Sequence, residues 1–179
     1  MRPNSKGRIL KAATIEFSSR GFDSVTIKDI AKRAKVSPGN IYVFYKDKAT
    51  LLNEAVSDYM QKVQLLCRKS PAGDSEFYGQ MISIASEDKY SMQCVINTPS
   101  EREKLVGYLT KEILRGCTEG KKESSSFRKL NARIAASATV TMVMEIIDHE
   151  KAYQSEHVQP GVLLEKTVSE IMCASEKAN

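Results

Sequence analysis

The stretch ILKAATIEFSSRGFDSVTIKDIAKRAKVSPGNIYVFYKDKATLL, residues 9–52, decides the fold. Its first part has apolar residues at helical spacing, which predicts a helix over about 5–20. Gly21 follows the last turn and is typical of a left-handed helix end, and Phe22 is placed to fold back on that turn. The apolar stripe of this helix consists of Ile9, Leu10, Ala13 and Phe17.

Two short helices follow, and each has a recognisable start. Thr26 and Asp29 resemble a capping box, with Asp in place of the usual Glu or Gln. Ser37 and Pro38 are a cap followed by proline at the first helical position. Two short helices separated by a brief connection predict a helix-turn-helix. We expect these helices over about 26–34 and 38–45.

The spacing of small and apolar residues fits two helices that cross closely. Ala31 is small enough to let the second helix approach the first, and Ile41 is placed to fill the gap between them. Val36, just past the turn, is placed to cover the end of the two crossing helices nearest the turn. These residues predict packing only and do not by themselves indicate a function.

Charge is distributed unevenly along the chain. Residues 1–48 contain eleven Lys and Arg against four acids, a net charge of +7, whereas residues 49–179 contain sixteen against eighteen, a net charge of −2. A basic N-terminal part on a slightly acidic remainder indicates a protein that holds a polyanion at one end.

The outer face of the second short helix is predicted to lie in the DNA major groove. Asn40 has the amide that pairs with the edge of adenine, and Val43 has methyl groups that suit a thymine methyl. Hydroxyl and lysine side chains around them suit phosphate. The alternative is that these are ordinary solvated surface residues. The predicted DNA-contacting residues are Thr26, Lys28, Ser37, Gly39, Asn40, Tyr42, Val43, Lys46 and Lys48.

Together these residues resemble the DNA-binding domain of TetR (tetracycline repressor)-type regulators. The resemblance implies an all-α chain: a three-helix domain with a helix-turn-helix over residues 1–47, and a helical effector-binding and dimerisation domain over residues 48–179. The matching residues, in order, are Ala12, Ala13, Phe17, Gly21, Phe22, Thr26, Ile30, Ala31, Ala34, Val36, Ser37, Gly39, Ile41, Tyr42, Tyr45, Lys48, Leu51 and Leu52.

Two positions depart from the family pattern. Lys35 replaces the glycine of the turn, so it must either adopt a left-handed conformation or bend the turn differently. Phe44 stands where the family often has histidine or another polar aromatic residue, which puts a DNA contact from that position in doubt.

The rest of the chain also has helical patterns, and proline occurs only at expected helix starts or in connections. A long helix begins at Lys48, and we expect further helices over about 76–87, 90–97, 100–117, 125–150 and 160–176. By the resemblance, the last two would pair with their copies in a homodimer. Small residues at 135–139 support close approach of helices. The alternative is that these stripes face only the chain's own core. The predicted dimer residues are Leu130, Ile134, Ala138, Thr141, Leu164, Val168 and Ile171.

The resemblance also implies a small-molecule effector that releases a repressor from a palindromic operator. Apolar and polarisable residues in the middle helices favour an apolar effector. A second hypothesis is a DNA-bound scaffold regulated by a protein partner, without a small-molecule effector. The predicted pocket residues are Met81, Tyr90, Met92, Cys94, Ile113, Cys117, Phe127 and Met142.

Other classes of protein are disfavoured by the sequence. The four cysteines and two histidines lack metal-ligand spacing, so we expect free thiols, no metal and no cofactor. The alternative for the cysteines is a thiol redox sensor. The catalytic motifs of common enzyme families are missing. No apolar run approaches the about 20 residues that span a bilayer, and the N-terminus does not resemble a signal peptide. We therefore expect a cytoplasmic protein with no membrane contact whose macromolecular partner is double-stranded DNA.

Overall fold

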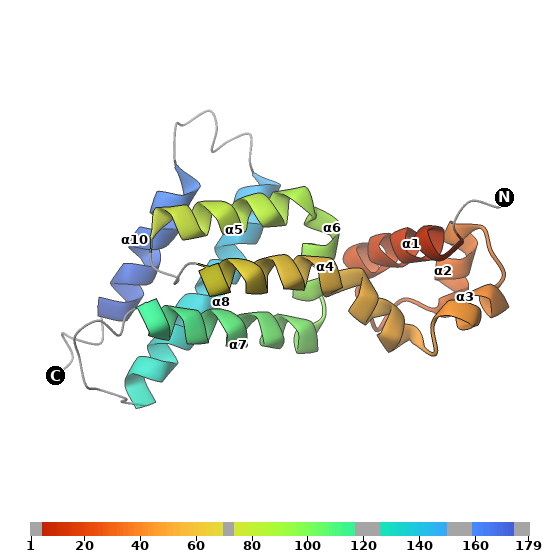
Figure 1. The fold of residues 1–179 in the computed structure, drawn as a ribbon, viewed down its shortest axis with the longest axis horizontal. Coiled ribbons are helices and arrows are strands. Elements are labelled where there is room, and N and C mark those ends of the chain that lie inside the picture. The colour runs from red at the N-terminus through yellow and green to blue at the C-terminus, as the bar shows by residue number, and fades with distance from the viewer. Residues whose placement is uncertain (1–4, 70–73, 117–125, 150–158, 174–179) are drawn as a thin grey trace. The chain divides into compact units, whose positions relative to one another are not determined.

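The computed structural model describes residues 5–69, 74–116, 126–149 and 159–173, and within these ranges the chain is helical, without strands (Figure 1). This confirms the predicted all-α class, and the helix bounds lie within a few residues of those expected. The helices are α1 (Ser5–Arg20), α2 (Ile27–Ala34), α3 (Pro38–Phe44), α4 (Lys48–Lys69), α5 (Ser75–Glu87), α6 (Lys89–Ile96), α7 (Pro99–Gly116), α8 (Ser126–Asp148) and α10 (Pro160–Cys173).

The chain divides into two compact units. The first consists of residues 1–61 and 88–102, and the second of residues 62–87 and 103–179. The first unit is therefore larger than the predicted DNA-binding domain of residues 1–47, because it also includes α6 and the first half of α4.

The first unit is built around α1, which contacts α2, α3 and α6. Gly21 ends α1 with φ +77°, and its N–H donates to the carbonyl oxygen of Phe17 at 3.0 Å. The rings of Phe17 and Phe22 lie 5.6 Å apart, so Phe22 folds back on the last turn as predicted. Burial of each large apolar side chain here contributes about 1.5–3 kcal/mol. Fully buried members of this core include Ile9, Ala13, Phe17, Ile30, Ile41 and Leu51.

Helix α6 is fixed to the first unit by polar contacts as well as by packing. Three side chains, two in α6 and one at the residue that follows it, donate hydrogen bonds to backbone carbonyl oxygens of α1 and α4. The bonds run from Ser91 Oγ to Ala55 at 2.9 Å, from Cys94 Sγ to Thr14 at 3.2 Å and from Asn97 Nδ2 to Ser18 at 2.8 Å. Because a hydrogen bond weakens steeply when its donor, hydrogen and acceptor depart from a line, these bonds fix the position of α6 on α1 as well as its proximity.

In the second unit α10 packs against α5 and α8, and α5 also contacts α8. The helices α10 and α5 approach closely at Gly161, where an added Cβ would lie 2.4 Å from the carbonyl oxygen of Ser75 and 3.1 Å from the nitrogen of Gly79. Glycine at this position therefore lets α10 lie directly on α5. The fully buried side chains of this unit include Phe77, Tyr78, Met81, Ala132, Ala135, Ala136, Val143 and Leu164.

One described segment, Lys129–Asp148 of α8, is long and apolar enough to cross a membrane by length and composition alone, with a mean hydropathy of 1.3. This differs from the expectation from the sequence, because small and apolar residues raise the average hydropathy without forming an unbroken apolar run. Half of the segment's apolar window is buried inside the structure, and core helices commonly have the same composition.

Candidate nucleic-acid interface

The helix-turn-helix begins at Thr26, which caps α2 as predicted. The Asp29 N–H donates to Thr26 Oγ1 at 3.2 Å, and Asp29 Oδ2 accepts from the Thr26 N–H at 2.9 Å and from its hydroxyl at 2.7 Å. The hydrogen bond from the Thr26 hydroxyl is the main reason that the pKa of the Asp29 carboxyl is lowered. This reciprocal capping box sets the starting direction of α2.

The turn after α2 keeps its geometry despite the lysine. Lys35 adopts φ 53° and ψ 49°, the left-handed conformation that glycine adopts most easily. Its N–H donates to the Lys32 carbonyl at 3.2 Å, and the Val36 N–H donates to the Ala31 carbonyl at 3.0 Å. Of the two outcomes expected from the sequence, the structure shows the left-handed lysine and not an altered turn.

Helix α3 begins as predicted, with Ser37 as cap and Pro38 at its first position. Ser37 Oγ accepts from the Asn40 N–H at 3.3 Å. Ile41 is fully buried between the helices, which confirms the packing predicted for it. Tyr45 ends α3, and its ring is also buried. The short helix is thus held from its inner face and both ends, so its outer face is fixed in direction.

The predicted base-reading residues lie on that outer face. Gly39 is exposed and Asn40 is half-buried. Tyr42 is 57% exposed and Val43 is 75% exposed. Phe44 is also exposed, at 42%. Side chains of this size are rarely left in water at consecutive positions without a contact surface.

The predicted phosphate contacts divide into two groups. Thr26, Lys28, Ser37 and Lys46 are exposed. Lys48 instead has a structural role that the sequence did not indicate. Its Nζ donates to the Phe22 carbonyl at 2.7 Å and to the Val25 carbonyl at 2.9 Å, and lies 4.2 Å from the centroid of the Phe22 ring.

Several other bases of the first unit are also engaged within it. The carboxylate of Glu16, only 7% exposed, accepts from Arg33 Nε at 2.5 Å and from Arg20 Nη1 at 3.2 Å, and so joins α1 to α2. Lys6 pairs with Glu54 at 2.9 Å. The i, i+4 spacing of Glu16 and Arg20 can be seen in the sequence, but the contact with Arg33 depends on the fold.

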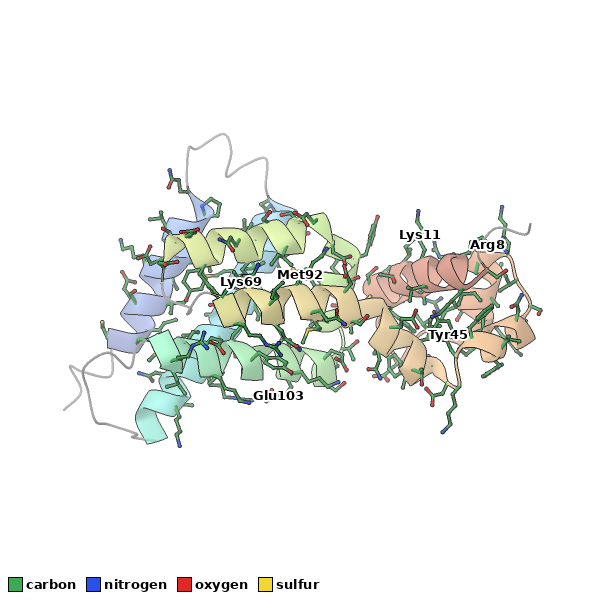
Figure 2. All side chains as sticks on the ribbon, in the orientation of Figure 1. Arg8, Lys11, Tyr45, Lys69, Met92 and Glu103 are labelled. Atoms are coloured by element: carbon green, nitrogen blue, oxygen red, sulfur yellow. The ribbon has the colours of Figure 1, made fainter. Side chains whose placement is uncertain are left out.

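The remaining bases form the candidate phosphate-binding surface. Figure 2 shows Arg8 and Lys11 extending outward from α1, whereas Tyr45 lies among the helices of its unit. These six bases are exposed and form no ion pair with another described residue: Arg8, Lys11, Lys28, Lys32, Lys35 and Lys46. Only part of the charge excess counted in the sequence is therefore free to meet a polyanion.

The predicted effector residues do not gather within either unit alone. Tyr90, Met92 and Cys94 belong to the first unit, and Tyr90 is 57% exposed. Met81 and Ile113 are buried in the second unit, and Met142 lines an open groove there. Cys117 and the side chain of Phe127 lie outside the described residues. The pattern that selected these residues is common to any helical core, so it could not distinguish a pocket from ordinary packing.

The described cysteines are free, in agreement with the expectation from the sequence. Burial raises the pKa of the Cys67 thiol to about 11 and that of the Cys94 thiol to about 12. Both are therefore protonated near neutral pH, which disfavours a thiolate redox sensor at these two positions. No group of three His, Cys, Asp or Glu residues suited to a metal ion occurs among the described residues.

The predicted dimer residues of α8 and those of α10 differ in how far they are buried. On α8, Leu130 is 51% exposed and Ile134 is 48% exposed. With Arg133, Ser137, Ala138, Thr141 and Met142 they line an open groove of about 580 Å³. On α10, however, Leu164 is fully buried within the unit and Val168 nearly so, while Ile171 is half-buried. Leu164 and Val168 are therefore core residues, a correction to the prediction. A periodic stripe indicates that a face is buried but not what covers it.

Comparison with known proteins agrees with this geometry. Residues 9–55 match the family described as bacterial regulatory proteins, tetR family. The N-terminal part of the chain is therefore similar to the DNA-binding domain of the tetR family. The match includes α2, α3 and the turn between them, as the resemblance in the sequence predicted.

Relatives in sequence match about a third of this chain. The HTH-type transcriptional regulator YdgC of Bacillus subtilis is 34% identical over 62 residues, which are 35% of this chain and 32% of YdgC. YdeS of the same organism is 40% identical over 57 residues, 30% of this chain and 29% of YdeS. The matched segment thus spans about a third of the length of these regulators.

Solved structures are similar over most of the chain. A protein assigned to the tetR family from Shewanella sp. PV-4 has a TM-score of 0.64 at 16% identity, covering 92% of this chain and 97% of that one. FadR of Bacillus subtilis, solved in complex with stearoyl-CoA, has a TM-score of 0.55 at 16% identity, covering 93% and 97%. At this identity the likeness shows that the fold is shared, and no more.

Proposed function

We propose that this protein is a DNA-binding transcriptional regulator that acts as a homodimer, with α3 of each protomer in the major groove of an operator half-site. One observation carries the proposal: the capped α2–turn–α3 unit presents an uncharged outer face on α3, flanked by exposed lysines that pair with no acidic residue in the described part of the chain. Base edges are read from such a face, and the flanking ammonium groups suit phosphate. The tetR-family match supports the same assignment.

Within this proposal, the phosphate contacts come from groups around α3. Thr26 stands at the N-terminus of α2, where unpaired backbone N–H groups favour an anion. Lys28 and Lys46 lie in exposed positions before and after α3. Lys48 supports the interface indirectly, because its ammonium holds the α1–α2 connection.

We also propose that the groove on α8 is the dimer contact. A groove with half-exposed Leu130 and Ile134 is costly in water and becomes favourable when a second copy covers it. Replacing Ile134 by Glu should shift the protein toward monomer in sedimentation and weaken operator binding. Leu65→Glu, at a similarly exposed leucine of α4, is the matched control and should leave both unchanged.

A small apolar effector that releases a repressor from its operator completes the proposal. The support is indirect: a protein of the same fold was solved with stearoyl-CoA. The second candidate is a scaffold regulated by a protein partner, whose helix would bind the open α8 groove in place of the second copy. A cytoplasmic location follows from a role on DNA.

The test is a selection of random duplex DNA on the purified protein at near-physiological salt, followed by sequencing of the bound pool. The proposal expects an enriched palindrome with half-sites about 34–36 Å apart, or a multiple of that distance. An unenriched pool would overturn it. The operator then serves to screen fatty acyl compounds for release, and transcription from a promoter carrying it decides between repression and activation.

A further inference from the structure

The recognition helix lacks the side chains that read guanine and cytosine. Guanine is read chiefly by Arg or Lys, and cytosine by Glu or Asp. The residues of α3, Pro38–Phe44, are PGNIYVF and include none of these four types. The nearest bases, Lys35 and Lys46, lie outside the helix at its two ends. Direct reading from α3 therefore rests on an amide, apolar groups and the Tyr42 hydroxyl.

Val43 is the most exposed large apolar side chain among the described residues, at 75%. It presents only methyl groups at the outer surface of α3. The matching feature on the floor of the major groove is the C5-methyl group of thymine, the apolar group by which a T·A pair differs from the other pairs there.

Asn40 lies three residues before Val43, so the two side chains share one face of α3. The backbone N–H of Asn40 is used by the Ser37 cap, but its side-chain amide forms no hydrogen bond with another described residue. An amide left open in this way can donate to N7 and accept from N6 of adenine in a bidentate pair. Adenine and thymine are partners, so both contacts select the same kind of base pair.

Gly39 is an exposed residue of α3 directly before Asn40. A Cβ built there would meet nothing closer than Ser37 Oγ at 4.0 Å, and the backbone is not left-handed. Neither packing nor conformation within the unit requires glycine at this position. Its lack of a side chain instead gives clearance for the N-terminal end of α3 to approach DNA closely.

We infer that α3 reads A·T pairs, with Val43 on a thymine methyl, Asn40 on adenine and Gly39 as the clearance that lets both reach the groove floor. This inference rests on the proposed function and specifies the base composition at its site.

The test uses the operator obtained by selection and replaces its thymines one at a time by deoxyuridine, which removes only the methyl group. At one thymine in each half-site we expect binding, measured by fluorescence anisotropy, to weaken about fourfold, the effect of uncovering one methyl-sized apolar group. Val43→Ala should weaken binding to the thymine operator and abolish the difference at that position. Leu65→Ala, at an exposed leucine of α4, should leave the difference intact.

Gly39→Ala tests the clearance separately. It should leave thermal stability unchanged or slightly higher, because alanine is the better helix former, yet weaken operator binding more than tenfold. Undiminished binding by this variant would overturn the role of Gly39.

The outcomes distinguish this inference from the proposed function. An enriched palindrome with G·C pairs beneath α3, or one in which no deoxyuridine replacement weakens binding, would overturn the A·T reading and leave the regulator proposal standing. A pool without enrichment would overturn both.

Discussion

The contacts inside the first compact unit differ in their balance from the contacts inside the second. In the first, side chains of one helix donate to backbone carbonyls of another, as from Asn97 to Ser18 at 2.8 Å, and Glu16 joins two helices through ionic hydrogen bonds. The second unit has bonds of this kind too, as from Asn131 of α8 to the Ile171 carbonyl of α10 at 3.3 Å, but it adds small residues that let helices meet closely, with Gly161 of α10 against Ser75 and fully buried alanines along α8. Directional bonds fix angles, whereas close packing of small residues fixes distance.

This difference fits the proposed function. A recognition helix loses contacts if it tilts, so its support must fix orientation and not only proximity. Variants that remove a directional bond in the first unit, or the close approach in the second, test whether the distinction holds.

The largest effect is expected at Lys48. Lys48→Met keeps the alkyl stem but removes two charge-assisted hydrogen bonds to Phe22 and Val25, so the free energy of unfolding should fall by about 2 kcal/mol. Chemical denaturation monitored by circular dichroism measures it. Lys46→Met, at an exposed lysine nearby, should change stability by less than about 0.5 kcal/mol. Lys46→Met should instead reduce the salt dependence of operator binding: the slope of the logarithm of the binding constant against the logarithm of salt concentration should fall by about one per site. Equal effects of the two variants on stability would contradict the structural role of Lys48.

In the second unit the corresponding change is Gly161→Ala. The added Cβ would stand 2.4 Å from a backbone oxygen of Ser75, so α10 must shift away from α5, at a cost of about 2 kcal/mol in unfolding free energy. Gly107→Ala is the matched control, because nothing lies within 4 Å of a Cβ there. It should be neutral or stabilise the protein by up to about 1 kcal/mol. If Gly161→Ala were as stable as the control, close approach would not be what holds α10.

The helix-turn-helix could be predicted from the sequence because the residues that start and end its helices act locally. Thr26 with Asp29, Ser37 with Pro38, and Gly21 each act within one turn of chain, and the structure confirms all three. Contacts between distant segments had no such signal. The bond from Cys94 to Thr14 joins α6 to α1 across a large separation in sequence, so the inclusion of α6 in the first unit could not be foreseen.

The site was predicted less evenly than the fold. Exposure of Tyr42 and Val43 follows from the helical position of Ile41, which must face inward. The hydrogen bonds of Lys48 to the Phe22 and Val25 carbonyls could not be predicted in this way, because the sequence does not distinguish a solvated lysine from one that is bonded within the fold. Leu164 and Val168 were misassigned for a similar reason: an apolar stripe does not identify the surface that covers it. Contact with DNA itself stays a prediction.

A smaller effect is expected when the ionic junction of the first unit is removed. Glu16→Gln replaces a carboxylate that is 7% exposed and joins Arg20 and Arg33. Both arginines are about half exposed and can be hydrated, so we expect a loss of about 1.5 kcal/mol rather than the larger cost of a fully buried pair. Glu103→Gln breaks an exposed pair with Arg133 in the second unit and should cost less than about 0.5 kcal/mol. Operator affinity should fall only for Glu16→Gln, because Glu16 contacts α2 through Arg33 and Glu103 does not. A similar loss of affinity in both variants would show that charge, and not orientation, is responsible.

The smallest effect should come from the turn, where Lys35 keeps a left-handed backbone at φ 53°. Lys35→Gly relieves the crowding of Cβ but adds freedom to the unfolded chain, so the net gain in unfolding free energy should be only about 0.5 kcal/mol. Lys35→Ala removes the same charge and keeps the strain. The difference in stability between the two variants therefore measures the backbone alone, and any loss of operator affinity that they share measures the charge. If both lose affinity equally while only the glycine variant gains stability, this turn accepts backbone strain in order to place a cation beside DNA. If neither variant loses affinity, Lys35 makes no phosphate contact, and the backbone strain at this turn is not offset by a gain in DNA binding.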